Sequence, residues 1–414
     1  MIWIKFGPQL ENLSDIKVLN RERLYHRSMN YLPVLVIGAG PAGLSIAYEL
    51  QRFGIDYLVL EASESVAKTF HDMTHQTTYG PWVNNLLRGT TWDVWGRFYR
   101  LLARTTRSEY AEYLEQYAQR LQLKVQLNTP VESVARTDGT YRVQTAEGVY
   151  QAAAIVNCAG YFATPYRPCY PGSETTRIPQ IHTSTYRSPA SVGKLIGDRG
   201  RVLIVGKKLS AGETLSELSA AGFETAISTR SPIEYWPDIW KETLKSPFIL
   251  VDEWLRRRLE LGRPEHLKPK MRFKEHGVTI HSGETPVYPE IQEIKQTSVL
   301  FQDGSEATFD LIVYGTGYQG NFSHLEGLKL PSLIRGEAPS VRQLESTELP
   351  NLFFVGLIGG SSFRSEFLRG IREDAQRVGE VIQSRARFSP IPLARCSSSP
   401  QLEACLDPAL AQVR

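Results

Sequence analysis

The sequence predicts an α/β protein built from two parallel-sheet units, with the second unit inserted into the first. A β-branched strand runs directly into a glycine turn twice, at 34–38 and again at 202–206. Two more buried strands, 152–156 and 310–314, lead into glycine-containing turns and would carry the chain out of the first unit and back into it. The length of 414 residues allows two or three domains of ordinary size.

The first glycine turn carries the most specific motif. Residues 38–43 match G-x-G-x-x-G in full, between a buried strand and a helix. Gly38 permits the tight turn, Gly40 lets a pyrophosphate approach the backbone, and Gly43 lets the helix pack against the strand. The helix N-terminus then faces the phosphates with its amides and its positive dipole end. Glu61 ends the next strand about 20 residues further on, the spacing of a carboxylate that accepts from a ribose hydroxyl.

The second glycine turn repeats this pattern with the opposite charge after its second strand. Gly206 ends the first strand, Ser210 and Ala211 begin the helix, and the next strand leads to Arg230. A guanidinium in that place can pair with a 2′-phosphate, whereas Glu61 favours a free ribose hydroxyl. We therefore expect the first unit to bind FAD and the second to bind NADPH.

One residue of the second turn departs from the motif. Lys208 stands where the second glycine is expected, so the backbone cannot approach a pyrophosphate in the usual way. Two outcomes are open: either Lys207 or Lys208 binds phosphate by charge, or the site binds NADPH poorly or not at all. We favour binding, because the small residues that begin the helix and Arg230 remain in place.

The order of these elements predicts the domain organisation. The fold class is α/β, with two Rossmann-like dinucleotide-binding domains and the NADP domain inserted into the FAD domain. The N-terminal extension is expected either to add little, with Met29 as the functional start, or to pack on the domain as a strand or arm. The predicted boundaries are 1–30 for the extension, 31–165 and 316–386 for the FAD-binding domain, 166–315 for the NADP-binding domain, 235–276 for a helical insertion within it, and 387–414 for a C-terminal tail.

Composition and charge exclude several classes of protein. The 47 basic and 44 acidic residues give a net charge of +3, too balanced for a protein that binds nucleic acid or an anionic membrane. The four cysteines form neither a C-x-x-C pair nor a zinc spacing, so we expect no metal site, no redox dithiol and a cytoplasmic setting. No apolar run approaches the ~18 residues of a transmembrane helix. The aromatic-rich stretch 62–107 and the insertion suggest an apolar small-molecule substrate, and a homodimer remains open.

Four segments together give the chain a family resemblance: 38–43, 181–187, 206–211 and 315–318. With them the chain resembles the class B flavin-containing monooxygenases, which include the Baeyer–Villiger and plant YUCCA-type enzymes. The resemblance implies that NADPH reduces FAD, that O2 then forms a flavin C4a-(hydro)peroxide, and that a small organic substrate is oxygenated at nitrogen, sulfur or a carbonyl. The alternatives are a flavin-dependent NADPH reductase or dehydrogenase without a redox dithiol, and a flavoprotein whose NADPH site has lapsed.

The resemblance also implies candidate catalytic residues. In the family an asparagine near the flavin protects the reactive flavin species, and Asn84 or Asn85 lies in the comparable region, with Asn85 preferred. His182 and Arg187 are expected to order the interdomain hinge or the nicotinamide. The expected cofactor contacts are Gly38, Gly40, Pro41, Ala42, Gly43, Glu61, Ala62, Val131, Gly160, Gly206, Lys207, Lys208, Ser210, Arg230, Thr316, Gly317 and Gly356.

Overall fold

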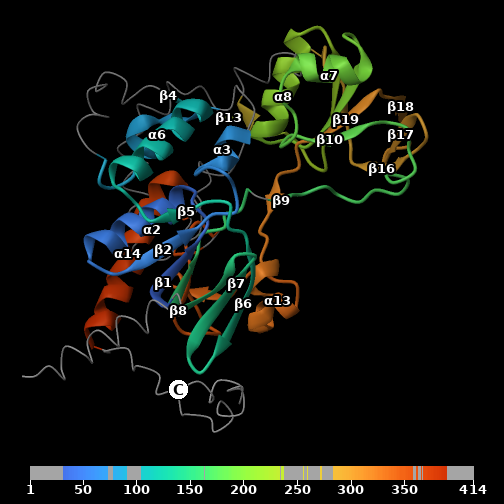
Figure 1. The fold of residues 1–414 in the computed structure, drawn as a ribbon. Helices are drawn as coiled ribbons and strands as arrows, with labels where there is room; N and C mark the ends of the chain where they lie inside the picture. The colour runs from blue at the N-terminus through green and yellow to red at the C-terminus, as the bar shows by residue number, and fades with distance from the viewer. Residues whose placement is uncertain are drawn as a thin grey trace, which may run out of the picture.

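Two sheets, one with a parallel centre and one entirely parallel, organise the chain into two lobes (Figure 1). The strands of the second sheet all come from the part of the chain between two neighbouring strands of the first sheet, β8 (Gly148–Asn157) and β23 (Leu352–Phe354). None of the helices in the described part of the chain has the length and apolarity needed to cross a membrane. The computed structural model describes residues 31–72, 78–90, 104–162, 164–233, 283–357 and 367–388, with short pieces at 235–236, 255, 259, 271–272, 360–361 and 365.

The first sheet has a parallel centre in the order β23–β8–β1–β2–β5. β1 pairs with β8 and β2, so Ile37 lies beside Asn157 and Leu60 at the carboxyl edge of the sheet. The hairpin β6–β7 extends β8, and the short strands β21 and β22 extend β23. The bounds are β1 Tyr31–Ile37, β2 Tyr57–Leu60, β5 Val125–Gln126, β6 Val131–Thr137, β7 Thr140–Thr145, β8 Gly148–Asn157, β21 Val341–Arg342, β22 Glu345–Ser346 and β23 Leu352–Phe354.

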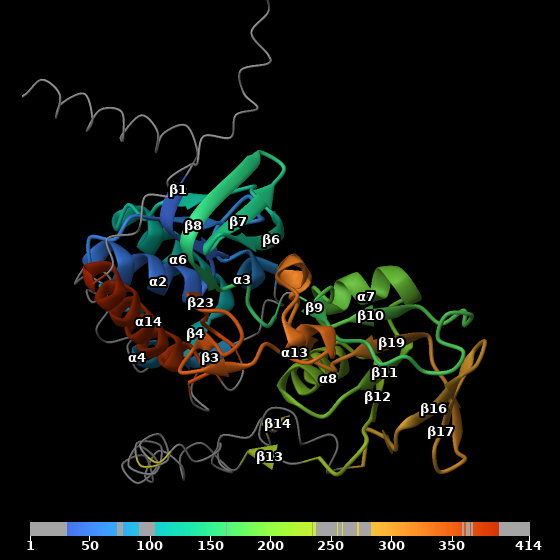
Figure 2. The same ribbon diagram turned by 90° about the horizontal axis from the view of Figure 1, so that it is seen from below.

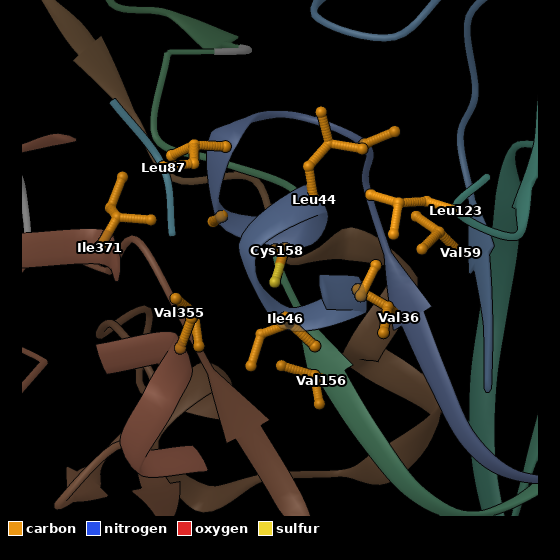
Figure 3. Packing of buried hydrophobic residues seen from close by; sticks show 14 of the residues in the cluster. Val36, Leu44, Ile46, Val59, Leu87, Leu123, Val156, Cys158, Val355 and Ile371 are labelled. Carbon is orange, nitrogen blue, oxygen red and sulfur yellow. The ribbon is translucent and has the colours of Figure 1, made fainter. Parts of the chain in front are cut away.

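The side chains of β1 alternate between two cores, one on each face of this sheet. Val34 and Val36 pack against helices, and Figure 3 shows Val36 close to Ile46 of α2 and Val156 of β8. Leu35 and Ile37 point to the opposite face, where the β6–β7 hairpin and η3 cover them. Burial on both faces explains why the strand is apolar throughout instead of alternating with polar residues. The helices are α2 Pro41–Arg52, α6 Arg107–Arg120 and α14 Leu368–Phe388 on the first face, and η3 Ser323–Leu328 and α13 Pro331–Ile334 on the second.

The second sheet is entirely parallel, in the order β10–β19–β11–β12–β15. In β11, Val202 and Ile204 face the helices α7 and α8, whereas Leu203 and Val205 face a three-stranded antiparallel sheet. The bounds are β10 Gln180–His182, α7 Pro189–Ile196, β11 Arg201–Val205, α8 Leu209–Ala220, β12 Glu224–Ser228, β15 Val287–Tyr288 and β19 Leu311–Tyr314, with β16 Ile291–Ile294, β17 Ser298–Phe301 and β18 Glu306–Thr308 in the antiparallel sheet.

Two chain crossings join the lobes and pair with each other. The outgoing crossing contains β9 (Thr164–Pro165) and the returning one contains β20 (Tyr318–Gln319), and these two strands pair antiparallel. Both figures place β9 between the lobes (Figures 1 and 2). The two lobes are therefore connected by a hydrogen-bonded pair of strands, not by two independent linkers.

Four smaller elements complete the helical side of the first lobe. The helix α6 begins at Arg107, with Thr106 as its N-cap and a reciprocal capping box to Glu109. Ser108, which is also a residue type that caps helices, is the second residue of α6. The bounds are α3 Lys68–Asp72, β3 Thr78–Pro81, α4 Trp82–Asn85 and β4 Arg104–Thr106.

The ends of the expected insertion are strands. β13 (Tyr235–Trp236) pairs parallel with β14 (Met271–Arg272). Apart from 255 and 259, the residues between them, for which a helical structure is predicted, lie outside the described residues, as do the N-terminal extension 1–30 and the tail from 389 onward.

Candidate functional site

The first glycine turn has the geometry that the sequence assigns to each of its three glycines. Gly38 adopts φ +97°, which a side chain would strain. A Cβ on Gly40 would meet no atom within 4 Å, so open space lies in front of this position. A Cβ on Gly43 would lie 1.9 Å from the Gly38 carbonyl oxygen, because the helix packs directly on the turn. The turn therefore combines close packing behind it with an open space in front of it.

The N-terminus of α2 faces this open space without a side-chain cap. Gly40 is the N-cap and offers no side chain to bond the first amides, and Pro41 follows as the first helical residue. Ala42 lies against Gly356 in the C-terminal part of the chain, since a Cβ on Gly356 would lie 3.5 Å from the Cβ of Ala42. Uncapped helix amides beside open space are able to bind an anion, and the absence of a side chain at Gly40 leaves the backbone accessible.

Glu61 follows β2 and turns back to the glycine turn. Its Oε2 accepts from the backbone N–H of Ala39 at 2.6 Å, and its Oε1 accepts from the N–H and the hydroxyl of Ser63 at 3.0 and 2.6 Å. These bonds fix the carboxylate at the carboxyl edge of the sheet, next to the turn. A carboxylate accepts up to about four hydrogen bonds, so capacity remains for a ribose hydroxyl.

The second turn has the same backbone geometry in spite of its lysine. Lys208 is the N-cap of α8, with φ −104° and ψ −168°, and Gly40 is the N-cap of α2, with φ −77° and ψ −173°. Both are extended conformations that any residue adopts, so the second glycine of the motif is not needed for the turn itself. The helix α8 likewise has no side-chain cap, and the Lys208 side chain is exposed.

The two turns divide their small residues differently between helix and neighbouring strand. In the first, the helix contributes Gly43, whose missing Cβ would lie 3.6 Å from the Cβ of Cys158 after β8. In the second, the helix contributes Ala211, and the residue after β19 is Gly315, where a Cβ would lie 2.7 Å from the Cβ of Ala211. A side chain on Gly315 would therefore clash with Ala211 in the second lobe. In the first lobe the contact with Cys158 would be of ordinary length, and the Gly38 carbonyl is what excludes a side chain on Gly43.

The basic residues of the second turn have different surroundings. The Lys207 Nζ donates to the carbonyl oxygen of Pro232 at 2.8 Å. Lys208 has no hydrogen-bond or ion-pair partner within the described ranges of the chain. Arg230 is 73% exposed, and its Nε lies 4.0 Å from a carboxylate oxygen of Glu290. Lys208 and Arg230 are therefore the two cations of this turn that are available to a phosphorylated ligand.

His182 ties the second lobe to the returning crossing. The backbone N–H of Ser184 donates to His182 Nδ1 at 3.0 Å, so Nε2 carries the proton and donates to the Gly317 carbonyl at 2.9 Å. The ring is 1% exposed and packs edge-on against Tyr318 at 5.2 Å. Burial lowers the pKa of His182, so it is a neutral donor in this contact. The Nδ1 contact thus fixes the ring within its own segment, and the Nε2 contact holds the crossing.

Arg187 makes a second link between the lobes. Its guanidinium donates to the carbonyl of Asp72, at the end of α3 in the first lobe, and to the carbonyl of Ser184 at 2.8 Å. A cation at a helix C-terminus satisfies carbonyls that lack a partner within the helix. His182 and Arg187 therefore lie within one short segment that bonds to both the crossing and the first lobe.

Asn85 lies in the packed side of the first lobe. Asn85 is 5% exposed, and its side-chain amide donates to the Thr105 hydroxyl at 2.9 Å. Its backbone carbonyl accepts from the Tyr110 hydroxyl at 3.0 Å. The half-buried Asn84 precedes it in α4. The structure brings Asn85 together with β4 and α6.

The remaining candidate contacts lie at the carboxyl edges or the crossings. Gly160 and Gly317 adopt positive φ values of +82° and +84° in the turns after β8 and β19. Thr316 donates its hydroxyl to the Tyr166 carbonyl of the outgoing crossing. Ala62 is exposed and follows β2. Val131 is the first residue of β6, and Ser210 is exposed in the first turn of α8.

Sequence patterns gave no signal for His324, which lies close to this edge. Its Nε2 and the Asn157 side-chain oxygen are 3.0 Å apart, across 167 residues of sequence, where β8 ends. Burial lowers the pKa of His324 to about 4. The contact depends on the packing of η3 against the first sheet, and a single histidine in so short a helix has no periodicity from which that packing follows.

The buried histidine predicts an acid-dependent loss of stability. An unfolded histidine has a pKa of about 6.5, so below that pH the unfolded chain binds a proton that the folded chain binds only near pH 4. The free energy of unfolding is therefore unaffected by this group above about pH 6.5. It falls as the pH approaches 4, by on the order of 2–3 kcal/mol from this group. We expect His324→Gln to remove that part of the fall in urea unfolding measured across this range.

A matched control separates this effect from general acid unfolding. His71 is 36% exposed and pairs with Glu115, so His71→Gln should retain the fall that the wild-type protein shows. The buried His182 acts in the same direction as His324, and a smaller slope should remain in His324→Gln. An unchanged slope in His324→Gln would contradict the assignment.

Comparison with known proteins agrees with this geometry. The pyridine nucleotide-disulphide oxidoreductase family model matches residues 35–356. An uncharacterized CzcO-like oxidoreductase of Geobacillus kaustophilus is 27% identical over 360 residues, which cover 83% of this chain and 96% of the relative. YUCCA4 of Arabidopsis thaliana, a probable indole-3-pyruvate monooxygenase, is 26% identical over 386 residues, which cover 84% of this chain and 89% of the relative.

A solved structure shows the same fold. The flavin-containing monooxygenase from Stenotrophomonas maltophilia matches with a TM-score of 0.72 at 23% identity, covering 86% of this chain and 100% of that one. The resemblance to flavin monooxygenases is confirmed, and with it the expectation of an oxidoreductase whose relatives use flavin and nicotinamide cofactors. Since the family model extends over most of its length, the chain belongs to the pyridine nucleotide-disulphide oxidoreductase family.

Proposed function

We propose that the protein is an FAD- and NADPH-dependent monooxygenase that uses O2 to oxygenate a small organic substrate at nitrogen, sulfur or a carbonyl. The observation that carries the proposal is the pair of uncapped helix N-termini at the edges of two parallel sheets, one near Glu61 and the other near Arg230. The monooxygenases among its relatives support the oxygen chemistry. In this proposal the FAD domain comprises 31–165 and 316–386, and the NADP domain is 166–315.

The first turn holds the FAD in this proposal. The open space at Gly40 receives the pyrophosphate, the free amides of α2 donate to it, and Glu61 accepts from the ribose. The bound flavin supplies the oxygen activation, and the chain binds it, orients it and excludes water from it. His182 and Arg187 act as positioning residues, because their bonds hold the crossing and α3 against the second lobe.

The second turn holds the NADPH by charge. Lys208 replaces the close backbone approach with an exposed ammonium at the N-terminus of α8, where helix amides already favour an anion. Arg230 lies past the end of β12, which pairs with β11 so that Val205 and Ser228 are neighbours. The exposed contact with Glu290 at 4.0 Å is weak and leaves the guanidinium available for a 2′-phosphate.

Removing Arg230 tests which of the two nicotinamide cofactors the site prefers. Arg230→Ala is expected to weaken NADP⁺ binding by roughly 10- to 100-fold and NAD⁺ binding by less than about twofold, because a hydrogen bond to a charged group contributes about 1.5–3 kcal/mol. Calorimetric titration of both cofactors gives the two dissociation constants. Arg342→Ala, an exposed arginine of the first lobe, should change neither. Equal losses for both cofactors in Arg230→Ala would show that Arg230 does not bind the 2′-phosphate.

The described cysteines bear on disulfide chemistry, which the alternative reductase without a redox dithiol does not use. Cys158 is buried, and burial raises the pKa of its thiol, which keeps it from acting as a nucleophilic thiolate. Cys169 is exposed, and these two thiols do not form a disulfide. Cys396 and Cys405 lie outside the described residues. Disulfide reduction is thus disfavoured for the two cysteines that the structure describes.

One experiment separates the monooxygenase from both alternatives. The purified flavoprotein is mixed with NADPH without oxygen, and oxygen is admitted once the visible flavin absorbance has bleached. A monooxygenase shows bleaching and then, after oxygen is admitted, a long-lived spectrum that matches neither oxidised nor reduced flavin. Bleaching followed by direct return to the oxidised spectrum favours the reductase. No bleaching indicates a lapsed NADPH site.

A further inference from the structure

Lys207 bridges the two halves of the second dinucleotide site. It lies in the turn between β11 and α8, and its Nζ donates to the Pro232 carbonyl at 2.8 Å. Pro232 lies two residues past Arg230, on the segment that follows β12. The contact therefore joins the phosphate end of the proposed site to its ribose end.

The opposite side of the Arg230 segment is held by the neighbouring strand. The Thr229 backbone N–H donates to the Tyr288 carbonyl of β15 at 3.1 Å, and the Thr229 hydroxyl donates to the Ser231 carbonyl at 2.7 Å. The Arg230 side chain itself is 73% exposed and has only the 4.0 Å contact with Glu290. The position of Arg230 is thus set mainly by its backbone, which is fastened by β15 on one side and by Lys207 on the other.

The two adjacent lysines have separate roles in this arrangement. The Lys207 ammonium already has an acceptor, whereas Lys208 is exposed and has none in the part of the chain that is described. An ammonium that bonds a carbonyl fixes two backbone segments together, and a free ammonium at a helix N-terminus attracts an anion. The pair therefore combines a structural tie with a phosphate contact.

We infer that Lys207 is a positioning residue for the 2′-phosphate: it holds the Arg230 segment against the glycine turn and does not bind phosphate itself. This rests on the proposed NADPH site. A guanidinium that is already in place loses less conformational freedom when it binds a phosphate, so the tie favours NADPH over NADH. Without it, the segment moves and only the 2′-phosphate contact weakens, since Lys208 and the α8 amides are unaffected.

The test uses two probes that separate the two phosphate positions. Adenosine 2′,5′-bisphosphate carries the 2′-phosphate, and ADP carries the pyrophosphate without it. Lys207→Met removes the charge and the donor, and should weaken the bisphosphate by roughly 3- to 10-fold in calorimetric titration, while ADP changes by less than about twofold. Lys207→Arg keeps a cationic donor of similar reach and should restore binding of the bisphosphate. Lys208→Met should weaken ADP.

A double-mutant cycle shows whether Lys207 acts through Arg230. In the Arg230→Ala background, Lys207→Met should cause no further loss for the bisphosphate, because the residue that it positions is gone. An equal loss for both probes in Lys207→Met would show that Lys207 binds phosphate directly and would overturn the inference. So would an undiminished loss in the Arg230→Ala background.

Failure of this inference is distinct from failure of the NADPH site. If the wild-type protein binds neither probe, the proposed NADPH site is wrong and the role of Lys207 falls with it. A second pattern overturns only the role of Lys207: the wild-type protein prefers the bisphosphate, Arg230→Ala abolishes that preference, and Lys207→Met keeps it. Because the Lys207 contact is exposed, the unfolding temperature of Lys207→Met should stay close to that of the wild type.

Discussion

The Gly40→Val protein is expected to fold and to purify without colour. Gly40 has an extended backbone that valine adopts without strain, and its new side chain would extend into space where no protein atom lies within 4 Å of the Cβ. That space is where we place the FAD pyrophosphate. Loss of two charged hydrogen bonds of about 1.5–3 kcal/mol each lowers the affinity for FAD by at least about 100-fold.

Two measurements and one control decide this prediction. The ratio of flavin to protein and the titration of apoprotein with FAD report binding, and circular dichroism reports the fold. Lys208→Val makes the matching change in the second turn, where the lysine already shows that a side chain is accepted, and should leave flavin bound. A Gly40→Val protein that retains one flavin per chain would place the FAD elsewhere.

The Gly43→Ala protein is expected to lose stability as well as flavin. The added Cβ would lie 1.9 Å from the Gly38 carbonyl, and the turn cannot yield easily because the Gly38 N–H bonds the Leu60 carbonyl at 2.8 Å. Overpacking a rigid site costs about 1–3 kcal/mol or more, and a backbone clash belongs at the upper end. The free energy of unfolding in urea should therefore fall by about 3 kcal/mol or more.

The second lobe provides the reciprocal control. Ala211 occupies the position equivalent to Gly43, and it fits because Gly315 has no side chain. Ala211→Gly should cost only about 1 kcal/mol, the ordinary penalty of glycine in a helix. If Gly43→Ala and Ala211→Gly destabilise the protein equally, the close approach of α2 to the Gly38 carbonyl is not the cause of the loss in Gly43→Ala.

Local patterns were sufficient for the elements in which neighbouring residues supply the interactions. The run at 34–37 followed by G-x-G-x-x-G predicts β1, the turn and α2, because each glycine acts within a few residues of its position. The same holds for α6, because the capping box between Thr106 and Glu109 acts within three residues. Strand Val125–Gln126 pairs parallel with β2, and a pairing between such distant residues has no local signal.

Contacts between distant segments were beyond the reach of sequence patterns. The Lys207 ammonium and the Pro232 carbonyl meet only because β12 returns beside β11. The Asn85 side chain is directed to Thr105 by the packing of α4 on β4. Neither partner can be named from spacing, since the folded path of the intervening chain decides which groups meet.

The sequence by itself determined that this chain forms two strand–turn–helix units followed by residues of opposite charge, because strand, glycine and helix signals are local and Glu61 and Arg230 follow them at similar spacings. Only the tertiary structure decided which lysine is free, how His182 and Arg187 connect the lobes, and why alanine fits one turn and not the other. Those outcomes depend on distances between segments that are far apart in the chain, and these distances are set by the packing of helices on the two sheets.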